Sequence, residues 1–363
     1  MWMIVFFVMP LLGMAYVGWH VWTLLPFGAW PKAIVIAVGV ACVLLLFLDI
    51  AGKLDHLPMP VAQVLYEIGT SSIIVLLYAV MLFLVVDILR LVRVLPAAWV
   101  THSGYGSGVV FFLLVAVFLY GYFNYMHKER VSLTLETSKP LPHDYKVVML
   151  SDLHLGYHNP RKELARWVDM VNAEKPDFVL IAGDIIDVSV RPLLEENAAE
   201  EFRRIKASVY ACLGNHEYYS GSPEARKFYE DAGIRLLSDT NAVIDDAITI
   251  IGRDDRTNTR RKPLAHLMQV VNKDNYTIVL DHQPYHLDQA ERSGVDFQLS
   301  GHTHRGQVWP MSWLTDKMYE CSWGSYQRGK TRYYVSSGIG IWGGKFRIGT
   351  QSEYVVATLR SKQ

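Results

Sequence analysis

Long apolar runs are confined to the first third of the chain, and short ones alternate with polar segments in the rest. Four runs come close to the ~20 residues that a helix needs to cross a bilayer core. They are Met1–Trp19, Ala33–Ile50, Ser71–Leu95 and Gly108–Phe123. No basic residues of a cleavable signal peptide precede the first run. The pattern therefore predicts four membrane-spanning helices in residues 1–126 and a multi-pass protein of the cell membrane.

Charged residues around these runs leave two questions open. The loops on one side of the predicted spans carry Lys32, Arg90 and Arg93, and the other side carries Lys53, Lys128, Arg130 and Lys139. This balance gives no preference for the side on which the rest of the chain lies. Asp87, inside the third run, is interpreted either as a paired or snorkelling carboxylate or as part of a lipid-headgroup or ion site.

The pattern changes after the fourth run. Residues 127–145 are polar, and Pro140 and Pro142 among them predict an extended linker. From residue 146 to residue 363, short apolar runs alternate with amphipathic segments. Buried strands are predicted at 146–150, 177–182, 208–213, 276–280 and 296–300, and helices at 161–174, 194–207, 224–233 and 263–272. This alternation, with hairpin-like strands near residues 241–252, predicts an α/β domain with added antiparallel strands.

Each of the five predicted strands ends in residues that can bind a metal or carry protons. In chain order these residues are Asp152 and His154, then Asp184 and Asp187, then Asn215, His216 and Glu217, then Asp281 and His282, and finally His302 and His304. A single histidine after a strand is usually an ordinary loop residue, and Asp and Asn are common turn formers. Five strand ends of this kind indicate more than turn residues, because ligands of α/β sheets bind at the carboxyl ends of strands. The spacing therefore indicates one shared site.

Composition narrows the chemistry of that site. Imidazole, carboxylate and amide oxygen suit Mn, Fe or Zn. The three cysteines, Cys42, Cys212 and Cys321, are scattered and read as packing residues, which argues against a structural zinc site. With 35 basic and 35 acidic residues the chain has no net charge, and no basic face for nucleic acid is evident.

The strand-end sequences resemble a known family. In order they read Asp-x-His, Gly-Asp-x-x-Asp, Gly-Asn-His-Glu, a lone His and Gly-His-x-His, and residues 145–358 resemble the calcineurin-like metallophosphoesterases. The stretches SDLHLG and GHTHRGQ are most similar to the membrane-associated bacterial branch of that family. The resemblance implies an α/β (α+β) sandwich of two facing β-sheets flanked by helices, which here would follow the transmembrane region.

The resemblance also implies roles for individual residues. Asp152, His154 and His304 would hold one divalent metal ion; Asn215, His282 and His302 would hold a second; and Asp184 would bridge both. His216 would sit over the substrate as a catalytic residue, with Asp187 orienting it and Glu217 in support. Mn is the favoured metal, ahead of Fe and Zn. Two such cations neutralise an anionic phosphoryl group and activate a water.

These observations predict a membrane-anchored phosphoesterase that hydrolyses a phosphodiester, a phosphomonoester or a pyrophosphate. Four spans exceed what a tether requires, so a lipid-linked phosphate ester and membrane lipids are the favoured partners, and no nucleic acid is expected. The first alternative is a membrane scaffold or transporter component with a non-catalytic metal-binding domain. The second is a metal-sensing module, which would leave His216 and Asp187 without a purpose.

Three further stretches keep two interpretations each. Residues 252–263 read as a solvated loop or as a basic lip for anionic groups, and Arg305 is a candidate phosphate contact. The Gly-rich residues 336–350 read as a loop that closes the core or as one that dips into the membrane. The Trp- and Met-rich residues 309–326 read as core or as an exposed apolar rim for acyl chains.

Overall fold

The computed structural model describes residues 2–362, with side chains from residue 8 onward. The chain divides into two compact units, and each is described by itself. The first comprises Met1–Phe123 with Gly343–Lys345, and the second comprises Asn124–Trp342 with Phe346–Gln363. The division lies close to the boundary predicted after residue 126.

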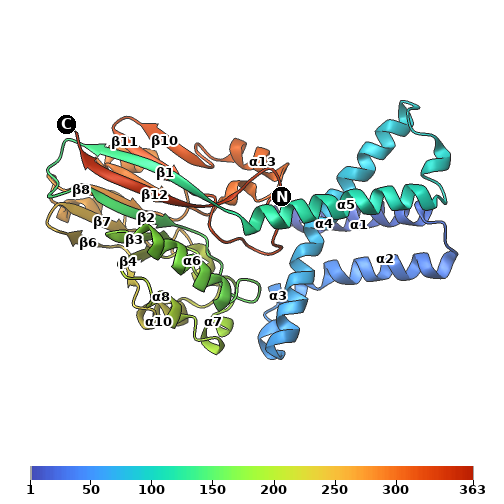
Figure 1. Ribbon diagram of the computed structural model, residues 1–363, viewed down its shortest axis with the longest axis horizontal. Coiled ribbons are helices and arrows are strands. Elements are labelled where there is room, and N and C mark those ends of the chain that lie inside the picture. Colours follow the sequence, from blue (N-terminus) through green and yellow to red (C-terminus); the bar gives the residue numbers. More distant parts are fainter. Residues whose placement is uncertain (1, 363) are drawn as a thin grey trace. The chain divides into compact units, whose positions relative to one another are not determined.

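The first unit is helical (Figure 1). Its helices are α1 (Trp2–Leu24), α2 (Ala29–Leu44), α3 (Leu46–Ile50), α4 (Met59–Leu91) and α5 (Gly104–Met126), with 3₁₀ turns at Leu54–His56 and Ala97–Trp99. Helices follow from the composition, because apolar runs of this length satisfy their backbone hydrogen bonds internally only as helices when they lie in lipid. Many of their apolar side chains are exposed, including Phe111 and Phe112 at 71% and 69%.

The number of predicted spans requires a correction from four to three. In the part of the chain that the structure describes, three segments are long and apolar enough to cross a membrane: Ala29–Ile50, Met59–Leu91 and Gly104–Met126. The first predicted run, Met1–Trp19, falls on α1, but the side chains of its first seven residues lie outside the described ones. That run therefore does not enter the count.

Asp87 on α4 is a paired carboxylate. It accepts a hydrogen bond of 2.6 Å from the Tyr16 hydroxyl, lies 3.1 Å from Nε2 of His20 and lies 3.9 Å from Arg90. The His20 ring is also stacked on Phe83, with ring centroids 4.4 Å apart. These contacts favour the interpretation of Asp87 as a carboxylate stabilised between helices.

The second unit contains two mixed six-stranded sheets (Figure 1). The first sheet has the order β1-β12-β2-β3-β4-β5 and the second has the order β10-β11-β9-β8-β7-β6. The first sheet consists of β1 (Lys128–Thr137), β12 (Ser352–Ser361), β2 (Tyr145–Leu150), β3 (Phe178–Ala182), β4 (Ser208–Cys212) and β5 (Arg235–Leu236). The second consists of β10 (Gly324–Arg328), β11 (Thr331–Val335), β9 (Phe297–Ser300), β8 (Tyr276–Leu280), β7 (Ile248–Gly252) and β6 (Thr240–Ile244).

Alternation of side chains along the strands explains the layers. On β2, Val147 and Met149 belong to the core between the two sheets, while Val148 and Leu150 belong to the core beneath the helices of the first sheet. Successive strand residues point to opposite faces, so a strand covered on both faces must be apolar throughout. The predicted sandwich of two facing sheets flanked by helices is confirmed.

Helices cover the outer faces of both sheets. They are α6 (Arg161–Glu174), α7 (Arg191–Glu195), α8 (Ala199–Phe202), α9 (Asn215–Tyr219), α10 (Ser222–Asp231), α11 (Leu264–Leu267) and α12 (Asp288–Arg292). A further helix, α13 (Met311–Met318), follows the loop after β9 and has Ser312 as its buried residue. The helix predicted over 194–207 is wrong: Asn197 adopts a left-handed φ of 54°, which separates α7 from α8. The helix predicted over 263–272 is shorter in the structure, where α11 is followed by a 3₁₀ turn at Met268–Val270. The next residue, Val271, is extended. Val270 and Val271 are both β-branched, and such side chains lower helix propensity.

The predicted linker also needs correction. Residues 128–137 form β1, which pairs in parallel with β12 from Lys128↔Ser352 to Thr137↔Ser361. Apolar residues at every second position, Val131, Leu133 and Leu135, face the core between the sheets, and this period of two is the signature of a strand. The polar composition of the stretch concealed that alternation.

Parallel pairing fixes where the site lies. Strands β2, β3 and β4 are mutually parallel in one sheet, and β7, β8 and β9 are mutually parallel in the other. Their carboxyl ends therefore share an edge within each sheet. The loops that leave those ends carry every residue of the predicted site.

Candidate metal centre

Loops from both sheets bring the predicted ligands together. Among the described residues, three groups place ligand atoms within 4.8 Å of one another: Asp152, His154 and His304; His154, Asp184 and His216; and Asp184, His282 and His302. The Asn215 side-chain oxygen joins them at 3.2 Å from Nε2 of His282. All seven predicted metal ligands thus lie in one cluster, although they come from five separate loops.

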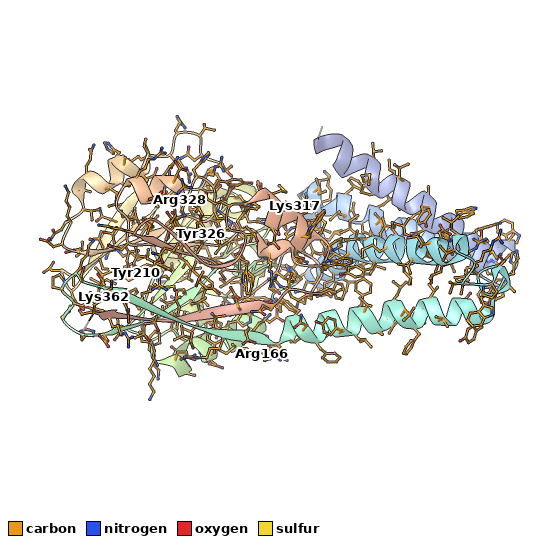
Figure 2. The ribbon with its side chains drawn as sticks, turned by 90° about the horizontal axis from the view of Figure 1, so that it is seen from above. Arg166, Tyr210, Lys317, Tyr326, Arg328 and Lys362 are labelled. Carbon is orange, nitrogen blue, oxygen red and sulfur yellow. The ribbon has the colours of Figure 1, made fainter. Side chains whose placement is uncertain are left out.

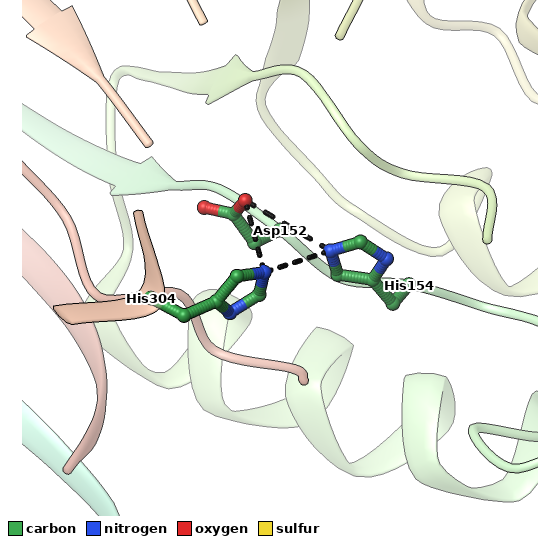
Figure 3. A group of neighbouring side chains, drawn as sticks. All are labelled: Asp152, His154 and His304. Carbon is green, nitrogen blue, oxygen red and sulfur yellow. Dashed lines mark hydrogen bonds and ion pairs between the residues drawn. The ribbon is translucent and has the colours of Figure 1, made fainter. Parts of the chain in front are cut away.

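The first group has the geometry of a cation site (Figure 3). Nε2 of His154 and Nε2 of His304 are 3.0 Å apart, and Oδ1 of Asp152 lies 3.9 Å and 3.5 Å from them. Nδ1 of His154 donates to the Asp187 carboxylate at 3.0 Å, so its Nε2 presents a lone pair to this space. Two imidazole nitrogens and a carboxylate oxygen facing one another fit a shared divalent cation.

The second group is oriented in the same way. Nδ1 of His282 donates to the Ala182 carbonyl at 2.7 Å, which turns Nε2 toward the ligand cluster. That Nε2 lies 3.0 Å from Oδ2 of Asp184. The same Asp184 oxygen is 3.7 Å from Nε2 of His154 in the first group. Asp184 therefore stands between the two ligand sets, where the bridging residue was predicted.

Strained backbone holds several of the ligands. Asp152, His154, Asp184, His302 and His304 all have left-handed φ values, between 46° and 71°. Such conformations are unfavourable for residues with a Cβ and concentrate at functional sites. Two glycines make room for the carboxylates: a Cβ on Gly214 would lie 2.1 Å from Oδ1 of Asp184, and one on Gly301 would lie 2.3 Å from Oδ2 of Asp152.

Glu217 has the supporting role that was predicted. Its buried carboxylate accepts backbone hydrogen bonds from Asp184 at 3.1 Å, Ile186 at 3.0 Å and Gly214 at 2.6 Å. These bonds join the loop after β3 to the loop after β4. Because they use both carboxylate oxygens, Glu217 fixes Asp184 and Asn215 relative to each other without facing the ligand cluster.

Burial and neighbouring charge set the protonation of the cluster. Burial raises the pKa of Asp184, but His282 and His216 outweigh it and hold that pKa well below its ordinary value. Burial likewise raises the pKa of Asp187, and hydrogen bonds from His154 and His216 bring it below the ordinary value. Burial and the charge of His282 lower the pKa of His302 to about 4. Asp184 and Asp187 are therefore ionised and His302 is neutral at neutral pH, whereas burial raises the pKa of Asp152 above its ordinary value. Ionised Asp184 and neutral His302 are in the form that metal ligands require.

His216 and Asp187 form a pair at the edge of the cluster. Nδ1 of His216 is 3.2 Å from Oδ1 of Asp187, and the His216 side chain is 12% exposed. Burial lowers the pKa of His216, but Asp184 and Asp187 outweigh it and raise the pKa to about 9. The same Asp187 also binds the ligand His154. The predicted orienting residue therefore serves two histidines, and His216 lies within ligand distance of His154 and Asp184.

Other marked residues take places outside the ligand cluster. Asp281 pairs with Arg253 at 2.7 Å and Arg261 at 3.0 Å. Arg305 stacks over the Trp323 ring at 4.0 Å. Its phosphate contact stays a prediction.

Arg347 is a site residue that sequence reasoning missed. Its side chain is completely buried and donates to the His304 carbonyl at 2.6 Å, the Gly340 carbonyl at 3.2 Å and the Ser352 hydroxyl at 3.2 Å, and it also bonds the Ser337 carbonyl. The loop it holds contacts the first ligand group through Gly340, whose N–H donates to the Asp152 carbonyl at 3.0 Å. A lone arginine among glycines carries no motif, so only the fold reveals this role.

The Gly-rich stretch closes the core where Arg347 holds it. Residues 336–341 are buried, and Gly338 packs so closely that a Cβ there would lie 2.8 Å from the Asp152 Cβ. The φ of +87° at this residue is a second reason for glycine. The core-closing interpretation therefore describes these six residues.

A two-sheet sandwich with clustered histidines and carboxylates at its strand ends defines a metal-binding α/β domain. Residues 145–306 match the family model described as calcineurin-like phosphoesterase. The chain is also 30% identical to an uncharacterized metallophosphoesterase of Aquifex aeolicus, over 63% of this chain and 90% of that relative. The chain belongs to the calcineurin-like metallophosphoesterase family.

Two further relatives extend the comparison. An uncharacterized metallophosphoesterase of Campylobacter jejuni is 35% identical, over 61% of this chain and 61% of that protein. A protein of Danio rerio described as a transmembrane protein with a metallophosphoesterase domain is 34% identical, over 59% of this chain and 53% of that protein. The chain thus spans between half and two thirds of the length of these two relatives. Together with the three apolar helices, the second relative indicates membrane association.

Arg347→Lys tests whether the buried guanidinium positions a metal ligand. Lysine keeps the charge but cannot hold the carbonyls of His304, Ser337 and Gly340 at once. We expect metal affinity to fall about 10- to 100-fold, measured by titrating chelator-stripped protein with Mn²⁺. Arg360→Lys, on the exposed end of β12, is the matched control. Unchanged affinity in a folded Arg347→Lys protein would contradict the positioning role.

Proposed function

We propose that this protein is a membrane-anchored phosphoesterase that works with two divalent metal ions. The observation that supports this most directly is the convergence of seven ligand residues from five loops, with Asp184 between the two sets. A scaffold or a non-catalytic module would not need the His216–Asp187 pair beside the ligands. Every predicted ligand position holds a competent donor, which also disfavours a decayed enzyme.

The residues of the cluster have distinct proposed roles in binding the two cations. Asp152, His154 and His304 hold one cation; Asn215, His282 and His302 hold the other; and Asp184 contacts both sets. When bound, the cations, with Mn favoured over Fe and Zn, supply positive charge to the phosphoryl group and activate a water. The Asp187 carboxylate and the Ala182 carbonyl accept hydrogen bonds from Nδ1 of His154 and of His282, respectively. Nε2 of each ring would therefore be the atom that binds a cation.

His216 is the proposed general acid. Asp187 holds it by Nδ1 at 3.2 Å, and the Asp184 and Asp187 carboxylates favour its protonated form. Nε2 is then free to donate to a phosphoryl oxygen or to give its proton to the leaving oxygen of the ester. Both His154 and His216 bind Asp187, and the His216 side chain is the more exposed of the two, at 12% against 0%.

A lipid-linked phosphate is the proposed substrate, and α13 supports it. This helix follows the loop of His302 and His304 and exposes Trp313 by 58%, Leu314 by 39% and Met318 by 46%; Trp309, just before it, is exposed by 53%. Lys317 of this helix is labelled in Figure 2. Its Nζ lies 3.6 Å from the centroid of the Trp313 ring. Exposed Trp and Leu beside a lysine are typical of a helix at a lipid interface. The rim interpretation of residues 309–318 is therefore preferred.

The first test is hydrolysis of bis-p-nitrophenyl phosphate by chelator-stripped full-length protein in detergent. We expect turnover to appear on addition of Mn²⁺ and to be absent without it. Asn215→Ala removes one ligand and should reduce turnover to the metal-free level. Asn241→Ala, on β6, is the control and should retain activity. Metal uptake without any turnover on phosphodiesters, phosphomonoesters or pyrophosphates would contradict the proposed activity.

The role of His216 requires its own variant. His216→Asn removes the proton donor and should lower kcat about 10²- to 10⁴-fold, while the bound metal per chain stays unchanged. The measurement pairs initial rates with metal analysis of the same sample, and the exposed His127→Asn is the control. Loss of metal from His216→Asn would identify the residue as a ligand instead.

The proposed role of α13 in lipid recognition is tested by comparing the hydrolysis of two substrates. Trp313→Ser with Leu314→Ser should lower hydrolysis of a long-chain lipid phosphate in proteoliposomes about tenfold or more, because two apolar contacts are lost. Hydrolysis of bis-p-nitrophenyl phosphate should not change. Leu194→Ser with Val243→Ser, both exposed on the same unit, is the matched control. Equal loss on both substrates would reject the role of α13 in lipid recognition.

A further inference from the structure

A large basic cavity lies apart from the metal centre. It has a volume of about 1040 Å³ and contains none of the seven ligand residues. Parts of α11, α12 and β8 line it, on the side of the second sheet where Leu264 of α11 and Ala290 of α12 pack against Val279. That face is opposite the core between the sheets, so the cavity is separate from the ligand cluster.

The charge of this cavity is one-sided. Six basic residues line it and no Asp or Glu does: Lys139, Arg253, Arg261, Lys262, Lys273 and Arg292. The chain as a whole has equal numbers of basic and acidic residues, so the bias is local. Asp281 is shared by two of the arginines, Asp296 pairs with Lys139 and Asp288 pairs with Arg292. Six positive charges therefore face three carboxylates, and the cavity attracts anions.

Arg253 gives the strongest sign of a ligand. Its side chain lines the cavity, is 5% exposed and is fixed by Asp281 at 2.7 Å and by Gln289 at 3.3 Å. Its Nε is buried and has no hydrogen-bond partner among the described residues. A buried guanidinium N–H without an acceptor is costly. The guanidinium therefore stands in the wall of the cavity, held in place, with donor capacity left over.

The remaining wall is apolar. Leu264 and Met268 line the cavity beside the basic residues, as does Val271. A ligand that uses both walls carries phosphate at one end and an apolar group at the other. Guanidinium and ammonium groups are the standard partners of phosphate in proteins.

We propose that this cavity is a second anion-binding site, independent of the metal centre, for a phosphate-bearing small molecule with an apolar portion. The basic stretch 252–263 then has a function beyond a solvated loop, because Arg253, Arg261 and Lys262 all belong to it. A nucleotide and a lipid phosphate share this chemistry, and the experiment distinguishes them.

The test is calorimetric titration of full-length, chelator-stripped protein in detergent, so that no metal binds phosphate. The probes are inorganic pyrophosphate, ADP and dihexanoyl phosphatidate. We expect saturable binding of pyrophosphate, weakened by salt, and tighter binding of ADP or of the short-chain lipid. Whichever of the two binds more tightly identifies the source of the ligand.

Two variants locate the binding. Lys262→Glu with Lys273→Glu reverses charge at two exposed lining positions and should weaken binding about tenfold or more. Lys162→Glu with Lys206→Glu makes the same charge change on exposed residues outside the cavity and should leave binding unchanged. Arg253→Lys keeps the buried charge but removes the free Nε–H, and should also weaken binding. Absence of saturable binding for all three probes, or equal affinity in the two double variants, would overturn the proposal.

Discussion

The burial of Asp184 between two sets of candidate metal ligands is the interaction on which the site depends. A carboxylate that is 1% exposed is unstable as an ion unless positive or donating groups surround it. His282 faces one of its oxygens at 3.0 Å, and the backbone N–H of His216 donates to the other at 3.0 Å. The loops after β3, β4 and β8 therefore have to meet at this side chain.

Backbone groups as well as side chains bring these loops together around Asp184. Gly183 and Gly214 approach within a distance that no Cβ allows, and Glu217 binds three N–H groups of the two loops. On the far side, Arg347 joins the His304 loop to the Gly-rich loop over Asp152. The strained backbone of the candidate ligand residues is maintained because the packed strands of both sheets fix the conformation of the loops between them.

The last residues of α5 belong to this network. Asn124 and Tyr125 belong to the unit that holds the metal centre. The Tyr125 hydroxyl donates to Asn159 at 2.8 Å, and Asn159 in turn donates to the His154 carbonyl at 3.0 Å. The last residues of α5 therefore help to support the loop that carries His154.

The sequence by itself determined the fold class and the five parallel strands whose loops carry the candidate ligands, because buried strands are apolar throughout and their polar ends stand out. It did not reveal β1, whose period of two is hidden by polar residues, or the break at Asn197, which depends on one left-handed residue. Only the tertiary structure decided that Arg347 supports His304 and that Asp281 binds arginines while its neighbour His282 faces the ligands. Those roles arise from contacts between segments far apart in the chain, so the local sequence pattern does not predict them.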